Sequence, residues 1–244
     1  MKKLPLVLAF SMLAPFAHAD RVLGLYAGVG TWLSDYDGKV GKPSASLSQL
    51  GVEEHYNNYF YVAIEHPVPL IPNIRLTQTK IKSAQTGTVT QSFTIGDTAY
   101  AANESVKSSF DLSHRDATFY YQLLDNWINL DLGVTARQFD GYVRAESISS
   151  KEKLDIDLTA PMLYSKAQFD LPFTGLSAGV EGNYTRYQGN SLNDYTAKLT
   201  YLFDSAVDLG VEVGYRKMSV KISDNKLKAD MTLKGPYAAL IAHF

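Results

Sequence analysis

The feature that most constrains the fold is a sustained alternation of apolar and polar residues in several segments of the chain. In 128–137 the even positions are apolar, and the odd positions are Asn, Asp, Gly, Thr and Arg. The segments 195–203 and 207–215 repeat the pattern. A period of two indicates a β-strand with one apolar face, and about nine to eleven residues suffice for a tilted strand to cross a bilayer. Strands of soluble sandwiches average about five or six residues, so the alternation favours a membrane barrel.

The first 19 residues have the order of a secretory signal peptide. Two lysines are followed by an apolar run over 4–16 and by a small-x-small site that ends at Ala19. A membrane anchor would need about 20 apolar residues, whereas this run is shorter and contains Pro5 and Pro15. We therefore expect export, cleavage after Ala19, and a single barrel domain over 20–244.

The composition narrows the class of protein. The chain has no Cys, so neither a disulfide framework nor a thiolate metal site is expected. A net charge of -2 argues against a nucleic-acid partner. No segment after residue 19 is apolar for long enough to form a membrane helix. Because backbone polar groups in lipid must be paired within the protein, the remaining membrane-spanning class is the closed barrel. A soluble periplasmic β-protein is the competing class.

The carboxy-terminal end supports an outer-membrane location. The chain ends on an aromatic residue after an alternating apolar strand, which is similar to the assembly signal of Gram-negative outer-membrane β-barrels. The residues that carry this signal are Ala238, Leu240, Ala242 and Phe244. Together with the signal peptide it favours apolar side chains outside and polar side chains inside. We then expect Trp32, Phe203 and Tyr215 to lie at the membrane interface.

Turn-forming residues divide the chain into ten predicted antiparallel strands in an up-and-down barrel. The strands are expected at 22–33, 57–66, 74–86, 108–124, 128–145, 154–171, 176–187, 192–203, 207–222 and 227–244. Short connections at 66–73, 125–126, 172–175 and 204–205 alternate with long ones at 34–56, 87–107, 146–153, 188–193 and 223–226. Periplasmic turns and extracellular loops alternate in this way, which places both termini in the periplasm.

Three irregularities accompany this assignment. The third segment loses its alternation after Leu76, and Pro161 interrupts the sixth strand. In the tenth strand the apolar positions change from odd to even at Gly235-Pro236, which predicts a β-bulge. Eight strands are the alternative, if the third and fourth segments form an extracellular hairpin.

The chain resembles a family of small outer-membrane β-barrel proteins of Gram-negative bacteria whose function is uncharacterised. The resemblance rests on the mature start at 22–32, on the Asn-Leu-Asp-Leu-Gly strand at 129–133, and on the end at 235–244. It covers the mature chain and implies the barrel fold and the outer-membrane location. It implies no reaction, ligand or functional residue.

Function therefore has to be read from the lumen. The registers point acidic and basic side chains inward from most strands: Glu65, Arg75, Asp116, Asp131, Arg137, Glu181, Asp194, Lys198, Asp208, Glu212 and Arg216. They could line a narrow pore for ions or small solutes, or they could form a plug of ion pairs with a structural role. Barrels of about eight strands are filled by side chains, and porins with aqueous channels have about 16 to 18. A barrel of ten strands is closer in size to the filled barrels than to the porins, so we favour the plug of ion pairs.

Two other functional classes receive less support. A hydrolase or acyltransferase at the rim would need an acid, a base and a nucleophile together, and only Ser113-His114-Arg115-Asp116 offers them. His114 and Asp116 share a strand face and are the only pair worth testing, whereas Ser113 points to the other face. We expect a non-enzymatic protein. A barrel that binds a hydrophobic ligand would need an apolar interior, against which the lumen charges argue.

The sequence predicts no cofactor and few partners. No metal-binding or phosphate-binding motif occurs, so no cofactor or metal is expected; Asp35 and Asp37 offer only a weak site for a divalent cation between lipid phosphates. The expected partners are outer-membrane lipid, lipopolysaccharide and the barrel-assembly machinery. The sequence gives no oligomeric state.

Overall fold

The computed structural model describes residues 23–203, 207–223 and 227–244. The predicted signal peptide at 1–19 lies outside them. The part of the chain that is described contains strands and turns, and none of it forms a helix with the length and apolar character to cross a membrane. The long strands are β1 (Gly24–Val40), β3 (His55–Glu65), β4 (Asn73–Thr79), β9 (His114–Asp125), β10 (Ile128–Glu146), β11 (Lys151–Asp170), β12 (Leu176–Tyr187), β13 (Asn190–Phe203), β14 (Asp208–Ser223) and β15 (Lys228–His243).

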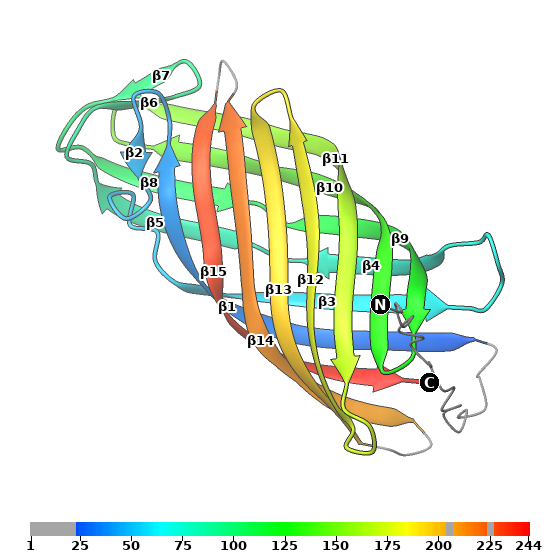
Figure 1. The fold of residues 1–244 in the computed structure, drawn as a ribbon. Helices are drawn as coiled ribbons and strands as arrows, with labels where there is room; N and C mark the ends of the chain where they lie inside the picture. Colours follow the sequence, from blue (N-terminus) through cyan, green and yellow to red (C-terminus); the bar gives the residue numbers. More distant parts are fainter. Residues whose placement is uncertain (1–22, 204–206, 224–226) are drawn as a thin grey trace, which may run out of the picture.

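These ten strands form one closed antiparallel barrel (Figure 1). The order around the wall is β1, β3, β4, β9, β10, β11, β12, β13, β14 and β15, and β15 pairs again with β1. Two strands have extensions after a short break: β5 (Lys82–Thr88) continues β4, and β8 (Ser105–Asp111) precedes β9. Ten antiparallel strands are confirmed, and the eight-strand alternative is wrong because β4 and β9 pair within the wall.

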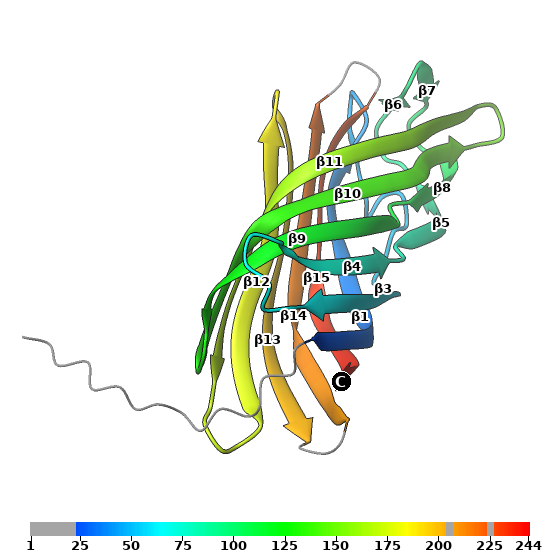
Figure 2. The ribbon, with the colours of Figure 1, turned by 90° about the vertical axis from the view of Figure 1, so that its right-hand side faces the viewer.

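The remaining strands lie at one end, which we call the hairpin end. β6 (Phe93–Ile95) and β7 (Thr98–Tyr100) pair as a separate hairpin there, and β2 (Ala45–Ser46) pairs with β1. The opposite end, where the last strand finishes, is the terminus end (Figures 1 and 2). At that end the backbone of Phe244 exchanges two hydrogen bonds with Leu25, at 2.9 and 3.3 Å, and so closes the seam between β15 and β1.

Several predicted boundaries are wrong in instructive ways. β1 runs seven residues past its predicted end, to Val40, and the expected long loop at 188–193 is a turn of two residues, Gln188 and Gly189. Pro161 does not interrupt its strand: it lies within β11, opposite Ala136, and its side chain points outward. An outward proline is tolerated where its missing N–H is not needed by the ladder.

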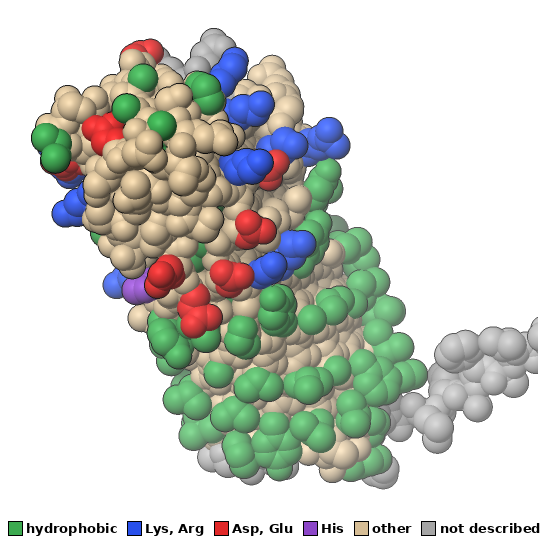
Figure 3. Space-filling model, turned by 90° about the vertical axis from the view of Figure 1, so that its left-hand side faces the viewer, with side chains coloured by type: hydrophobic (Ala, Val, Ile, Leu, Met, Phe, Trp, Pro, Cys, Tyr) green, Lys and Arg blue, Asp and Glu red, His purple; other side chains and the backbone are tan. Residues whose placement is uncertain are grey.

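A belt of exposed apolar side chains surrounds the terminus-end half of the wall (Figure 3). Phe203 and Tyr215 belong to it, with 53% and 50% of their surfaces exposed. Toward the hairpin end the belt gives way to acidic and basic side chains. Such a belt is what a transmembrane barrel presents to lipid. Trp32 is an exception to the predicted interface aromatics, because it is inside the barrel and 0% exposed.

The interior is divided into two compartments by a change of pattern along the strands. In β15, Leu240 points outward and is 65% exposed, whereas Leu233 points inward and is fully buried. The same change occurs in β14 between the exposed Val213 and the buried Met218. The pairing of β14 with β15 continues through Gly235 and Pro236 without a shift. The predicted bulge is therefore wrong: the side-chain alternation is unbroken, and the apolar positions move from the outer face to the inner face.

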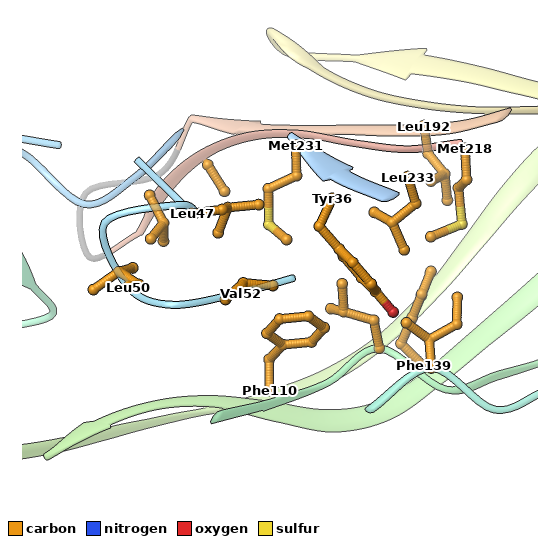
Figure 4. Packing of buried hydrophobic residues seen from close by; sticks show 14 of the residues in the cluster. Tyr36, Leu47, Leu50, Val52, Phe110, Phe139, Leu192, Met218, Met231 and Leu233 are labelled. Atoms are coloured by element: carbon orange, nitrogen blue, oxygen red, sulfur yellow. The ribbon is translucent and has the colours of Figure 1, made fainter. Parts of the chain in front are cut away.

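The hairpin-end half consequently has a packed apolar core, which we call the apolar compartment (Figure 4). It contains side chains from the barrel strands, the hairpin and the loops, among them Tyr36, Leu47, Leu50, Val52, Phe110, Phe139, Leu192, Met218, Met231 and Leu233. A residual cavity of about 40 Å³ remains beside it. This half thus resembles a soluble barrel, with an apolar interior and a charged exterior.

One part of the wall in this half is not closed by a strand ladder. β1 pairs with β3 only as far as Ser34, and β5 pairs only with β8 among the described strands. The space between β1 and β5 is filled by residues 41–54, which we call the wall segment. A Cβ atom added to Gly87 of β5 would lie 2.2 Å from the carbonyl oxygen of Gln49. The two backbones are therefore in contact without exchanging a ladder of hydrogen bonds.

Candidate functional site: the charged lumen

The terminus-end half of the barrel holds the predicted charges in layers. The layer next to the apolar compartment is built around Arg137, whose side chain is 1% exposed. Its guanidinium donates to both carboxylate oxygens of Asp116 at 2.8 and 2.7 Å and lies 2.8 Å from Asp194. Asp194 in turn accepts two hydrogen bonds from Arg216 at 2.9 and 2.7 Å. Two cations and two carboxylates from β9, β10, β13 and β14 thus balance one another across the lumen.

Aromatic and sulfur contacts complete this layer on its apolar side. The guanidinium of Arg216 lies 4.9 Å from the centre of the Trp32 ring. The Nη1 of Arg137 lies 3.7 Å from the sulfur of Met218. The cation–π contact explains why a tryptophan occupies an inward position at the boundary between the two compartments.

A second layer lies nearer the terminus end. Glu181 is 3.0 Å from Arg75 and 3.2 Å from Lys198, and Lys198 is also 3.1 Å from Glu212. Tyr237 donates to Glu212 at 2.7 Å. Strands β4, β12, β13 and β14 therefore supply an alternating chain of two bases and two acids. Each charge has an opposite partner, as burial in a narrow lumen requires.

Below this layer the lumen widens into a polar cavity of about 390 Å³, the terminus-end chamber. Glu65 accepts hydrogen bonds there from Tyr120 at 2.6 Å and Gln122 at 3.0 Å. Asp131 is 3.2 Å from Lys166. The layers above leave less room: the cavity beside Arg137 and Asp116 measures about 60 Å³.

The structure places ten of the eleven predicted lumen charges along these two cavities, namely Glu65, Arg75, Asp116, Asp131, Arg137, Glu181, Asp194, Lys198, Glu212 and Arg216. Asp208 is the exception. It lies at the rim of the terminus end, 3.7 Å from His243, whose ring stacks on Tyr26. Of the predicted assembly residues, Ala238, Leu240 and Ala242 share the outward face of β15, and Phe244 follows the strand with 45% of its surface exposed.

The candidate catalytic pair is not joined in the structure. His114 is 2% exposed, and its Nδ1 lies 3.0 Å from the carbonyl oxygen of Leu112. Its Nε2 has no partner among the described residues. Both oxygens of Asp116 bind Arg137 instead. Ser113, on the opposite face, accepts a hydrogen bond from the N–H of Ile81 at the break between β4 and β5. The described residues also contain no cluster of three or more His, Asp or Glu side chains suited to a metal ion.

Sequence reasoning missed the uncharged groups that hold the lumen carboxylates. Tyr120 and Tyr237 bind Glu65 and Glu212, and Tyr61 lies under the guanidinium of Arg75 at 4.1 Å. For two of them a signal was available, since Tyr61 has the same parity as Glu65 in β3 and Tyr120 the same parity as Asp116 in β9.

No protein-family model matches the chain, and no curated protein matches its sequence. Solved structures with a similar fold include the outer membrane protease OmpT from Escherichia coli, at 10% sequence identity and a TM-score of 0.47, with 91% of this chain and 97% of that chain covered. The transport unit of the autotransporter AIDA-I from E. coli has 9% identity and a TM-score of 0.41, with coverages of 96% and 92%. A Pseudomonas aeruginosa FadL homologue has 12% identity and a TM-score of 0.35, with coverages of 93% and 65%. The similar structures are thus bacterial outer-membrane barrels of differing function.

Proposed function

We propose that this protein is an outer-membrane barrel with a structural role whose lumen is closed to ions and solutes. The observation that carries this proposal is the Arg137 layer, in which four strands contribute two acids and two bases that satisfy one another. A selective pore needs charges that exchange partners with the permeating ion. Here Arg137 is already engaged by three carboxylate oxygens of two acids.

The apolar compartment adds a second barrier. Any solute that passed the charge layers would meet packed side chains such as Tyr36, Phe139 and Met218, which are 5%, 6% and 0% exposed. An ion would lose its hydration there without gaining a partner. The charges and the apolar core therefore act in series to close the barrel.

Location and partners belong to the same proposal. The apolar belt and the polar interior fit a bilayer around the terminus-end half, with the hairpin end in the extracellular space and both termini in the periplasm. The charged side chains above the belt would then meet lipopolysaccharide, and the terminal strand would be the one recognised by the barrel-assembly machinery.

The test is single-channel recording of the refolded mature protein in a planar bilayer. Heat-modifiable migration on a detergent gel shows beforehand that the barrel is folded, and a known porin shows that insertion is detected. We expect a silent bilayer for the wild type. Discrete openings whose ion selectivity changes in Arg137→Ala or Glu181→Ala would contradict the proposal and identify the lumen charges as a filter.

A second candidate function is the binding of a small hydrophobic molecule in the apolar compartment. The observation that favours it is the wall segment, since a loop there replaces a strand ladder between β1 and β5. Its inward side chains Leu47, Leu50 and Val52 occupy space that a ligand could share, and Gln49 ties it to Thr90 by a hydrogen bond of 2.5 Å. A ligand would enter sideways by displacing this segment.

An apolar fluorescent probe, 1-N-phenylnaphthylamine, tests this candidate. Because the chain has no Cys, a disulfide in Gln49→Cys/Thr90→Cys can lock the wall segment without competing thiols. We expect probe uptake by the wild type, slower uptake by the oxidised double variant, and recovery after reduction. Equal uptake in both redox states would mean that the probe reports only the detergent or the outer surface.

A further inference from the structure

The terminus-end chamber differs from the layers above it in its charge balance. Among the described residues that line it, and leaving Asp125 aside, there are five carboxylates and three Lys or Arg side chains. The acids are Glu65, Asp131, Asp170, Glu181 and Glu212, and the bases are Arg75, Lys166 and Lys198. The Arg137 layer, by contrast, has two of each. The chamber therefore has an excess of negative charge in a partly enclosed space, where such charge attracts cations most strongly.

Two of these carboxylates are held only by neutral donors. Glu65 binds a tyrosine hydroxyl and a glutamine amide. Asp170 binds the side-chain amides of Asn129 at 2.5 Å and Gln168 at 2.8 Å. Neither has a cation within 4 Å among the described residues. The neutral donors fix the positions of the carboxylates without cancelling their charge.

A third carboxylate is incompletely paired. Asp131 is 0% exposed and lines the chamber, yet its Oδ1 atom has no partner among the described groups. Its Oδ2 faces Lys166 at 3.2 Å but makes no hydrogen bond of good geometry. A buried carboxylate oxygen without a donor is costly, so this atom marks a place where a donor from outside the chain would bind favourably.

The walls of the chamber are suited to an organic cation. Tyr26, Tyr61, Tyr120 and Tyr164 line it, and aromatic rings attract ammonium groups through their faces. The three carboxylates project from β3, β10 and β11, and β3 is separated from β10 by β4 and β9 in the wall. Asp131 and Asp170 project from paired strands, and Glu65 therefore approaches a bound molecule from a different side of the wall. The volume of about 390 Å³ falls within the range of small-molecule sites, about 300–1,000 Å³.

We propose that the terminus-end chamber binds an organic cation with more than one ammonium group, of the polyamine class, which enters from the terminus end. One ammonium group would lie at Asp131, and others would lie near Glu65 and Asp170. This binding role goes beyond a closed structural barrel. The binding role is tested by affinity, whereas the closed barrel is tested by conductance. Either proposal can therefore fail while the other stands.

Isothermal titration with spermidine, on the refolded mature protein in a zwitterionic detergent, tests the site. The variant Glu65→Gln/Asp170→Asn removes two chamber charges. The matched control Asp155→Asn/Asp157→Asn removes two charges from the outward face of β11. We expect at least tenfold weaker binding for the chamber variant and less than twofold change for the control. Putrescine should bind more weakly than spermidine, and an uncharged polyol should not bind.

A variant that is expected to bind more tightly distinguishes loss of the site from misfolding, because a misfolded barrel would not gain affinity. Lys166→Met removes one of the three chamber cations and frees Asp131, so spermidine should bind several-fold more tightly while the heat-modifiable migration stays unchanged. Absence of spermidine binding to folded wild-type protein would overturn the proposal. So would an equal loss in the chamber and control variants, because binding would then depend only on overall charge. Weaker binding in Lys166→Met would also overturn it.

Discussion

The charge balance around Arg137 leads to a quantitative prediction about stability. Asp116→Asn keeps the size of the side chain but leaves Arg137 and Arg216 to share a single carboxylate, Asp194. Arg137→Met does the reverse and leaves Asp116 without a cation. The double variant Asp116→Asn/Arg137→Met removes one charge of each sign, and the remaining Asp194–Arg216 pair, with its bonds of 2.9 and 2.7 Å, is balanced again.

The magnitude follows from burial. Removal of one partner of a buried ion pair costs about 3–5 kcal/mol, because the charge that remains is desolvated and unpaired. The cavity of about 60 Å³ beside Asp116 and Arg137 gives water some access to that charge. We therefore expect a loss at the lower end, about 3 kcal/mol for Asp116→Asn, or roughly 150-fold in the unfolding equilibrium constant. The double variant should lose less free energy than either single variant.

The assay is reversible urea unfolding of the protein in lipid vesicles, followed by tryptophan fluorescence and by heat-modifiable migration. Asp155→Asn is the control, since Asp155 pairs with Lys153 at 2.6 Å on the exposed outer wall and such pairs contribute about 0–1 kcal/mol. If Asp116→Asn lost no more free energy than the control, or if the two single losses simply added in the double variant, the balanced-layer argument would be refuted.

Three further predictions concern the seam, the hairpin and the carboxy-terminus. Gly235→Ala should destabilise the barrel by about 1–3 kcal/mol in the same urea assay, because its Cβ would lie 1.9 Å from the carbonyl oxygen of Leu33; an unchanged midpoint would contradict this close approach. The pKa of Glu104 is lowered because its carboxylate accepts hydrogen bonds from the hydroxyl of Ser147, which has the largest effect, from the hydroxyl of Ser149 and from the backbone N–H of Ala101. Hairpin docking should therefore be tightest above the ordinary pKa of a glutamate and weaken as the pH falls through the lowered value; hydrogen exchange over 89–104 should show this, and Glu104→Gln should remove the pH dependence. Deletion of Phe244 should reduce the yield of assembled barrel in cells several-fold more than Phe244→Tyr does, measured by membrane fractionation, and equal yields would remove the terminal aromatic from the assembly signal.

Much of the fold was predictable because a single physical constraint acts on every membrane strand. Each strand must be apolar on its lipid face, so the alternation in 128–137 and 207–215 identified two strands and their orientation. The terminal strand shows where this reasoning failed. Its apolar residues change from odd to even positions at Gly235-Pro236, and this change predicts a bulge that the structure does not contain. The apolar compartment explains the change of positions without any irregularity, because the apolar side chains of β15 face lipid in one half and the protein core in the other. Periodicity alone cannot distinguish a register shift from such a change of environment.

The candidate site was predictable to the extent that it depends on parity. Inward parity placed Arg137 and Asp194 in the lumen, yet nothing in the sequence says that β9, β10, β13 and β14 bring their charges to one height. That depends on the stagger of the strands around the wall. His114 illustrates the same limit, since it shares a face with Asp116 but its ring contacts the carbonyl oxygen of Leu112 while the acid binds an arginine.

The reversal of the strand pattern also determines how deep the protein sits in its bilayer. A barrel with lipid-facing residues along its full length could slide along the membrane normal at little cost. Here a shift of two residues toward the terminus end would bring outward charges such as Lys217 and Asp35 toward the hydrocarbon, and a shift the other way would expose Leu209 and Leu25 to water. Charged residues on the lipid face cost up to about 2–4 kcal/mol each at the midplane, and around ten strands such costs accumulate. Vertical position is thus encoded in the chain, and an envelope protein held at one depth presents its hairpin end at a constant height above the membrane surface.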